Sequence, residues 1–300
     1  MTEATQAAYL SPDARKILEE ATHHDGTPPV SDQALLAVAQ GRRRLFEEPD
    51  AIGIIGEGEL DLVVRPTQRG KGIGRALLRT LLGSDEAWTE LRAWAHGENP
   101  AATALLRGAG FEPVRELLRL ALDPATLDQA IGAARSLPEG FEVREYSPGA
   151  EGHADQADDW VRVNAAAFAS HPEQGQMSRA DFDALTREPW FAADDLRLAY
   201  ATSGERQGEL TGFSWVKTVQ EGNTTETELY VLGVDPTFAG IGLGAALLGE
   251  TLRQMATHRP NRITLYVDGD NTNAVALYAR AGFVVEQRSM QYLRAATRPR

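Results

Sequence analysis

Two glycine-rich turns are the stretches of this chain whose residue types and spacing most directly suggest chemistry. The second turn, PTFAGIGLGAALL, runs from Pro236 to Leu248 and places Gly240, Gly242 and Gly244 at alternate positions. Glycines spaced in this way leave backbone N–H groups uncovered at the start of the following helix, where the helix dipole also favours an anion. The turn therefore predicts a phosphate site, although its spacing matches neither the P-loop nor the dinucleotide fingerprint. The alternative for an isolated copy is a tight turn that needs glycine only to bring helix and strand together.

The same turn occurs a second time. PTQRGKGIGRALL runs from Pro66 to Leu78, and each copy follows an apolar run and precedes a segment with helical spacing. The correspondence continues downstream, where GENPAATALLRGAGF, residues 97–111, matches GDNTNAVALYARAGF, residues 269–283. A duplication explains this match better than chance does, and it favours the phosphate interpretation over a plain turn.

Composition narrows the classes of function. A chain of 300 residues with 42% hydrophobic and 24% charged residues is typical of two globular domains. A net charge of -13 without a basic block argues against nucleic acid or an anionic membrane as a partner. Because there is no cysteine and no HxxxH or HExxH spacing, we expect no metal. No apolar run approaches the roughly 20 residues of a membrane span, and no signal sequence is apparent, so a cytoplasmic location is expected.

The elements that must position the two turns follow from periodicity. The spacing predicts helices in SPDARKILEEATHHD and DDWVRVNAAAFA, and strands in RELLRLALD, LRLAYAT, TGFSWVKTV, TTETELYVLGV and HRPNRITLYVD. PATLDQAIGAARSLPEG is predicted to be a connector with a short helix, after which FEVREY begins the second unit. The order is helices, antiparallel strands, glycine turn, helix, strand, helix and strand, twice over. We therefore predict an α+β (α/β layered) fold with two tandem domains, residues 1–138 and 139–300, each a mixed, mostly antiparallel sheet flanked by helices.

Both halves resemble the acetyl-CoA-binding core of the GNAT superfamily of acetyltransferases. The resemblance rests on V-x-P-x-x-x-G-x-G-I/L-G-x-A-L-L followed by N-x-x-A-x-x-L-Y-x-x-x-G-F, and it covers nearly the whole chain. It implies that the loop amides hold the pyrophosphate of coenzyme A, that the preceding strand pairs with the pantetheine arm, and that the later Asn and Tyr lie beside the thioester. The first copy keeps Arg69 and Lys71, whereas the second has Ala239 and Ile241. We therefore expect phosphate binding in the second copy to rest on backbone amides alone.

The resemblance implies acetyl-CoA contacts in both halves and no metal. In the second half they come from Leu232, Gly233, Val234, Ala239, Gly240, Ile241, Gly242, Leu243, Gly244, Ala245, Asn271, Thr272, Asn273, Ala274, Val275 and Ala276. In the first half they come from Leu62, Val63, Val64, Gly70, Lys71, Gly72, Ile73, Gly74 and Arg75, a cofactor site without evident catalysis.

Acetyl transfer to an amine needs a base for the ammonium proton, stabilisation of the oxyanion, and an acid for the departing thiolate. Glu228 and Tyr278 supply a carboxylate and a phenol in the second half, and counting back from the glycine turns gives Gly58 and Leu106 as their counterparts. We therefore predict that the second half is catalytic. The alternatives are a solvated edge charge for Glu228 and helix packing for Tyr278, and Glu226, on the same strand face, is the second candidate for the base.

Further segments are similar to one branch of the superfamily, tandem enzymes whose second half acetylates the cysteinyl amine of cysteinyl-glucosaminyl-inositol. These segments are PPVSDQALL, NAAAFASHPEQGQMS, GFSWVKT, ELYVLGVDP and LYVDGDNTNAVALY. The similarity implies substrate contacts from Asp32, Glu173, Lys217, Glu228 and Tyr266. Asp32 has an alternative as a helix-start acid behind the N-cap Ser31, and Lys217 as a solvated strand end.

Two other functions stay open on sequence alone. One is a tandem GNAT enzyme acting on another amine, such as an aminoglycoside or a peptide N-terminus. The other is a non-catalytic acyl-CoA-binding regulator, against which the carboxylate and phenol of the second half argue. In the favoured interpretation the partners are acetyl-CoA and a small-molecule amine, and the protein acts as a monomer.

Overall fold

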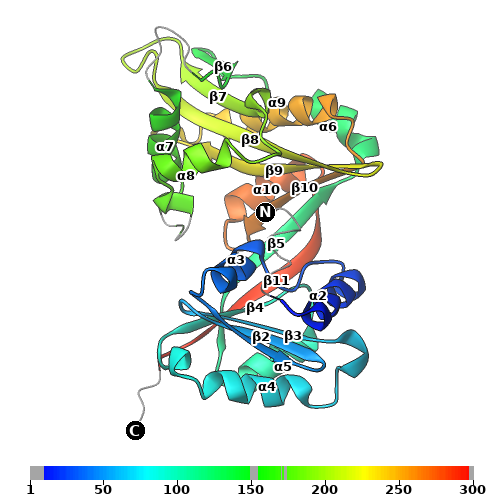
Figure 1. Ribbon diagram of the computed structural model, residues 1–300. Coiled ribbons are helices and arrows are strands. Elements are labelled where there is room, and N and C mark those ends of the chain that lie inside the picture. Colours follow the sequence, from blue (N-terminus) through cyan, green and yellow to red (C-terminus); the bar gives the residue numbers. More distant parts are fainter. Residues whose placement is uncertain (1–9, 149–154, 170, 172–173, 297–300) are drawn as a thin grey trace. The chain divides into compact units, whose positions relative to one another are not determined.

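The computed structural model describes residues 10–148, 155–169, 171 and 174–296, with the backbone alone for Asp32 and Glu221. Within this part of the chain, two compact units form (Figure 1). The first comprises residues up to Leu118 together with Asp268–Asp270 and the segment from Gln287 onward. The second comprises Arg119–Val267 and Asn271–Glu286. Each unit therefore combines stretches that are distant in the sequence. The division predicted from the sequence, into domains of residues 1–138 and 139–300, stays a prediction.

The first unit is a sheet between two pairs of helices. Its elements are α2 (Pro12–Asp25), α3 (Asp32–Ala39), β1 (Arg44–Glu48), β2 (Ala51–Gly56), β3 (Glu59–Val64), α4 (Ile73–Leu82), β4 (Leu91–Ala95), α5 (Pro100–Gly108), most of β5 (Glu112–Leu122) and the end of β11 (Val284–Arg294). Strands β1, β2 and β3 are antiparallel, β3 and β4 are parallel, and β4 and β11 are antiparallel. Figure 1 shows α2 and α3 on one face of this sheet and α4 and α5 on the other.

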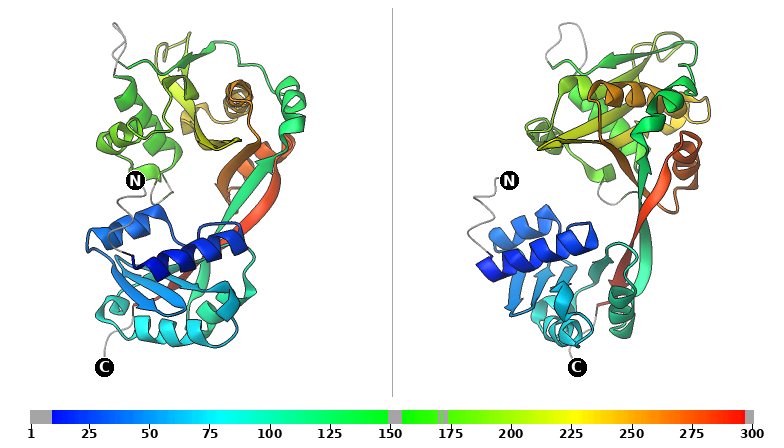
Figure 2. Two further views of the ribbon diagram at one scale, coloured as in Figure 1. Left: turned by 45° about the vertical axis from the view of Figure 1, so that its right-hand side comes forward. Right: turned by 90° about the vertical axis from the view of Figure 1, so that its right-hand side faces the viewer.

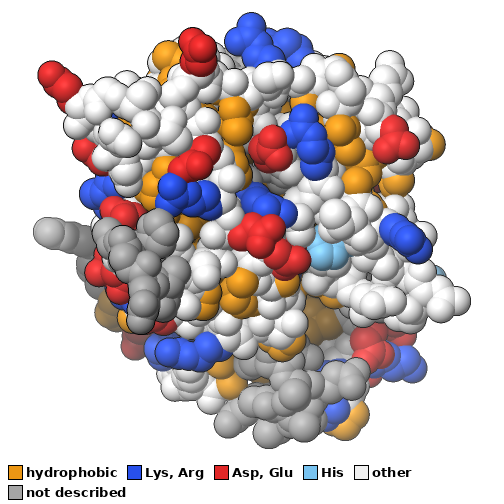
Figure 3. Space-filling view, turned by 90° about the horizontal axis from the view of Figure 1, so that it is seen from above, with side chains coloured by type: hydrophobic (Ala, Val, Ile, Leu, Met, Phe, Trp, Pro, Cys, Tyr) orange, Lys and Arg blue, Asp and Glu red, His pale blue; other side chains and the backbone are white. Residues whose placement is uncertain are grey.

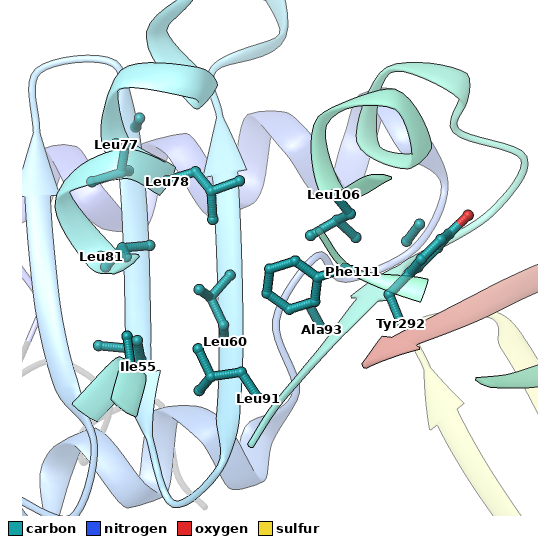
Figure 4. Packing of buried hydrophobic residues seen from close by; sticks show 13 residues of the cluster. Ile55, Leu60, Leu77, Leu78, Leu81, Leu91, Ala93, Leu106, Phe111 and Tyr292 are labelled. Atoms are coloured by element: carbon teal, nitrogen blue, oxygen red, sulfur yellow. The ribbon is translucent and has the colours of Figure 1, made fainter. Parts of the chain in front are cut away.

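Alternating residues of β2 supply the two cores of the first unit. Ile52 and Ile54 pack with α2 and α3, whereas Ala51 and Ile55 pack with α4. The second of these cores also contains Tyr292 of β11, whose hydroxyl donates to Thr103 Oγ1 at 3.1 Å (Figure 4). The last strand of the chain is therefore part of the first unit's core.

The second unit repeats this arrangement. Its elements are the end of β5, α6 (Leu127–Gly132), β6 (Phe141–Glu145), α7 (Gln156–Ala167), α8 (Arg179–Leu185), β7 (Leu196–Ala201), β8 (Leu210–Glu221), β9 (Thr224–Val234), α9 (Leu243–Thr257), β10 (Arg262–Asp268), α10 (Thr272–Arg280) and the start of β11. The strand order from β5 is β5-β10-β9-β8-β7-β6, antiparallel from β6 to β9 and parallel between β9 and β10. This mixed, mostly antiparallel sheet confirms the predicted fold class.

Two cores lie on opposite faces of the second sheet. An aromatic core on the α7 and α8 side contains the fully buried rings of Trp160, Phe213 and Trp215. An aliphatic core on the α9 side contains Leu243 and Leu247. Figure 2 shows α7 and α8, in green, across the sheet from α9, in orange. Burial of each such large side chain contributes about 2–3 kcal/mol, so both faces of β9 are firmly held.

The expectation that nucleic acid and anionic membranes are not partners rests on the absence of a basic block in the sequence. On the face shown in Figure 3, basic and acidic side chains are interspersed over the part that the structure describes. Among the described residues, no helix combines the length and apolar character needed to cross a membrane.

Candidate active site

Each glycine turn forms a left-handed bend directly before a helix. Gly240 and Gly242 have φ of 82° and 92°, matching 79° and 85° at Gly70 and Gly72. No side chain caps α9 at Gly242. The first hydrogen bond of the helix runs from Ala246 N–H to the Gly242 carbonyl, at 3.1 Å. The N–H groups of the first turn come before this bond and therefore have no carbonyl partner within the helix. The predicted turn contacts of both halves therefore lie where backbone donors are available.

Strands β9 and β10 part in the middle of the second sheet. Their parallel ladder joins Glu226–Leu229 to Arg262–Leu265 and ends there. Beyond Leu229, the described residues of β9 have no strand on this edge, and the predicted contacts Leu232–Val234 fall on this stretch. An exposed strand edge offers amide and carbonyl groups to an extended ligand, as the pantetheine arm requires.

A register shift marks the start of the opening. Trp215 of β8 pairs with Val231 and Val216 pairs with Leu229, which leaves Tyr230 without a partner on β8. Both Tyr230 and Val231 consequently pack against the aromatic core. The first unit has no such shift, because β2 and β3 pair without interruption. The shift thus distinguishes the second half from the first at this position.

This extra residue changes which positions correspond in the two halves. In the first unit Glu59 pairs with Arg92, and in the second Glu228 pairs with Thr264. Arg92 and Thr264 are equivalent positions, because the number of residues between them equals the number between the matched Gly97 and Gly269. Glu59, the partner of Arg92, is therefore equivalent to Glu228, the partner of Thr264. The counterpart that sequence counting gave, Gly58, is therefore wrong, because counting back from the turn ignores the extra residue.

Glu59 is nevertheless held differently from Glu228. Arg43, only 4% exposed, donates from Nη1 to Glu59 Oε2 at 2.9 Å and from Nη2 to Asp61. Burial raises the pKa of Asp61, and Arg43 opposes that rise. A carboxylate bound to a buried guanidinium is a poor proton acceptor, because protonation would leave the cation less well paired.

Glu228 is half-buried and accepts no hydrogen bond from the described part of the chain. Burial raises the pKa of its carboxyl group, Lys217 lowers it, and Glu226 raises it further. Lys217 is directly across the strand pair from Glu228. Glu226 differs, since it accepts from Arg119 Nη2 at 2.6 Å and from Thr264 Oγ1 at 3.0 Å. The structure therefore favours Glu228 over Glu226 as the proton acceptor.

Tyr278 lies on α10 and is 7% exposed, with its ring edge against Phe283. Burial raises the pKa of Tyr278 to about 12. A thiol has a pKa of about 8.5, so full transfer of the phenol proton to a thiolate is uphill in this environment. Its burial and its contact with Phe283 also fit the helix-packing alternative, and a role of the hydroxyl toward the departing sulfur stays a prediction. Asn271 begins the same helix as its N-cap and accepts from Ala274 N–H at 3.1 Å.

The structure brings three of the five predicted substrate residues together in the second unit. Lys217 and Glu228 face each other, and the charges of Glu228 and Glu226 raise the pKa of Tyr266 beside the larger effect of burial. Glu173 lies outside the described residues. Asp32 begins α3 in the first unit, behind the N-cap Ser31, whose side chain accepts from Ala34 N–H. That backbone position fits the helix-start alternative.

Sequence reasoning missed two aromatic residues, one of which follows Glu228 on β9 and one of which lies beside Lys217. Tyr230 and Trp190 have ring centroids 5.2 Å apart, and Lys217 Nζ lies 5.5 Å from the Trp190 ring centroid. Burial raises the pKa of Tyr230, and the charge of Glu228 raises it further. Strand alternation with Glu226 and Glu228 could have identified Tyr230, whereas nothing in the sequence singles out Trp190.

Comparison with known proteins yields one family. The model of the acetyltransferase (GNAT) family matches residues 11–111 and 160–283. The chain is 40% identical to the mycothiol acetyltransferase of Clavibacter sepedonicus, with 98% of this chain and 97% of that protein covered. It is 40% identical to the mycothiol acetyltransferase of Streptomyces avermitilis, with 92% and 89% covered.

Solved structures share the fold. A tandem GNAT protein from the clavulanic acid biosynthesis pathway has a TM-score of 0.65 and 16% identity, with 97% of this chain and 98% of that chain covered. A GCN5-related N-acetyltransferase from Sphaerobacter thermophilus has a TM-score of 0.64 and 21% identity, with 96% and 93% covered. At these identities the likeness concerns the fold alone.

Proposed function

The chain belongs to the GNAT family of acetyltransferases, in which its relatives are mycothiol acetyltransferases, and we propose that it works as one of them. The proposed reaction transfers the acetyl group of acetyl-CoA to the cysteinyl amine of cysteinyl-glucosaminyl-inositol, which gives mycothiol and completes its biosynthesis. We further propose that the enzyme acts as a monomer in the cytoplasm, without a metal.

The observation that carries the proposal is the position of Glu228. A half-buried carboxylate without a described hydrogen-bond partner lies on β9 one residue before Leu229, the last residue of β9 that pairs with β10. The opened edge then leads to the glycine turn and the first turn of α9. The proposed sites for the amine and for acetyl-CoA thus lie along one strand, so the two bound molecules can meet for acetyl transfer.

Each residue has a defined part in the proposed mechanism. Acetyl-CoA supplies the activated acyl group. Glu228 takes the proton from the ammonium, directly or through water, so that the amine nitrogen can attack the thioester carbonyl. As the carbon–nitrogen bond forms and the carbon–sulfur bond breaks, Tyr278 donates a hydrogen bond to the sulfur that takes up the negative charge. The second proton that the nitrogen loses passes through water to this thiolate, which gives free coenzyme A. Lys217 and Tyr266 orient the polar acceptor beside Glu228.

Mass spectrometry tests this proposal. Purified protein is mixed with acetyl-CoA and cysteinyl-glucosaminyl-inositol, and the product is then treated with iodoacetamide. We expect one added acetyl group and a thiol that still alkylates, because the nitrogen and not the sulfur is acetylated. Acetylation of an aminoglycoside or a peptide N-terminus in place of this amine would point to another tandem GNAT enzyme. Binding of acetyl-CoA without any acetylated product would point to a regulator.

A further inference from the structure

A basic side chain reaches the second glycine turn from elsewhere in the second unit. The turn's own residues are apolar where the first copy has Arg69 and Lys71, yet Arg135 lies beside it. A Cβ placed on Gly242 would be 2.8 Å from Nη1 of Arg135 and 3.9 Å from its Cζ. The guanidinium thus lies against the residue that precedes the first turn of α9.

Contacts on both sides fix the backbone around Arg135. On one side, a Cβ on Gly249 would come within 2.6 Å of the Ala134 Cβ, so the absence of a side chain at Gly249 lets the connector lie directly on α9. On the other side, Leu137 packs against the aliphatic core that contains Leu243 and Leu247. Figure 1 shows α6, which leads into this connector, beside α9. The position of Arg135 therefore follows from packing.

The charges at this place are unbalanced. Within the described part of the chain, Arg135 makes no ion pair or hydrogen bond, and it lies at the positive end of the α9 dipole. Arg135 is exposed, so water weakens its repulsion by the positive end of the helix dipole, and an anion bound between them would replace this repulsion with attraction to both. In the first unit the corresponding charge is already compensated, because Arg69 donates from Nη1 and Nη2 to the two carboxylate oxygens of Asp25, each at 2.7 Å.

We propose that Arg135 binds the pyrophosphate of the acetyl donor in the second half, replacing the basic side chains that its glycine turn lacks. This assignment rests on the proposed function. Two negatively charged phosphoryl groups satisfy the amides of the turn and the guanidinium together, and an arginine fork suits phosphate oxygens. The cation is supplied by the connector between the two repeats and not by the turn itself.

Truncated donors test the assignment. Arg135→Ala should raise the KM for acetyl-CoA roughly tenfold, the loss typical of one charge-assisted hydrogen bond, with kcat little changed. The same penalty is expected with 3′-dephospho-acetyl-CoA, which keeps the pyrophosphate. The increase in KM should disappear with S-acetylpantetheine, which lacks the pyrophosphate. A purely structural role of Arg135 would instead raise the KM for all three donors alike. Arg135→Lys should recover part of the affinity.

Arg253→Ala is the matched control, because it removes the same charge from the exposed surface of α9, where Arg253 pairs with Glu250. It should leave every KM near that of the wild type. If Arg135→Ala has the wild-type KM for acetyl-CoA, or loses its effect with the 3′-dephospho donor, the pyrophosphate assignment is wrong. Failure of the wild-type enzyme to acetylate any amine would instead count against the proposed function.

Discussion

Glu226 and Glu228 lie two residues apart on β9, and only Glu228 is free to take a proton. Oε1 of Glu226 accepts from both Arg119 and Thr264, so the negative charge of Glu226 is already compensated in part. Glu228 has a raised pKa, chiefly because of burial, and Lys217 moderates the rise. A carboxylate with a raised pKa is a stronger base once it is ionised, and it ionises at a higher pH than an exposed one.

Replacing Glu228 tests its role as the base. Glu228→Gln keeps the size and much of the hydrogen bonding but cannot accept the proton, so kcat should fall by roughly 10²–10⁴-fold. The wild-type rate should rise with pH as the carboxyl group ionises, and this limb should flatten or move in the variant. Steady-state rates across pH measure both effects, and calorimetry checks that acetyl-CoA still binds.

Glu226→Gln is the matched control for this experiment. It removes a charge two residues away on the same strand face, and it should keep most of the rate. If Glu226→Gln is inactive while Glu228→Gln is active, Glu226 is the base. Since the substrate ammonium also titrates, the comparison is made between variants and not on one curve.

Among the elements, β9 carries Glu228, and the aromatic core packs closely against this strand at Gly233. A Cβ at this position would lie 2.9 Å from ring atoms of Phe213 and 3.2 Å from the Ala167 Cβ. Phe213 is fully buried, so neither neighbour can move without disturbing the core. The glycine is therefore required by packing, in addition to any contact with a ligand.

Gly233→Ala should lower the free energy of unfolding by about 1–3 kcal/mol, as expected for overpacking of a core. Gly244→Ala is the control, because its Cβ would meet only Val234 at an ordinary 3.7 Å. That change should leave stability equal or higher by about 0.5–1 kcal/mol, since alanine favours the helix. Urea unfolding monitored by tryptophan fluorescence compares the two. Equal midpoints would contradict the close packing of β9.

The sequence predicted these elements better than it predicted their surroundings. TTETELYVLGV coincides with β9, and the predicted helix at the N-terminus coincides with α2, because alternation and capping are local signals. The unpaired Tyr230 depends on pairing with β8, and local patterns do not record it. The ion pair at Arg43 and the position of Arg135 depend on tertiary packing, so composition and spacing give no signal for them.

Over the whole molecule, two copies of one fold surround the corresponding carboxylates, Glu59 and Glu228, differently. Both copies keep the glycine turn, the open strand edge and the helix that begins at an Asn cap. In the first, Arg43 binds the carboxylate of Glu59, and no register shift interrupts the strands. In the second, Glu228 is available beside the shift at Tyr230. Catalysis by the second half therefore stays a proposal, as does cofactor binding by both halves.

Parallel substitutions of Gly72 and Gly242 test this division of labour most directly. Both residues have positive φ and precede a helix, so the backbone strain of glutamate is similar at either position and its charge repels phosphate at both. A Cβ at Gly242 would in addition meet Arg135 Nη1 at 2.8 Å, whereas a Cβ at Gly72 would meet no atom within 4 Å. Turnover should be abolished by Gly242→Glu and largely retained by Gly72→Glu, which should instead lose one bound acetyl-CoA in calorimetry. Equal loss of turnover in the two variants, or loss in Gly72→Glu alone, would contradict the assignment of catalysis to the second half.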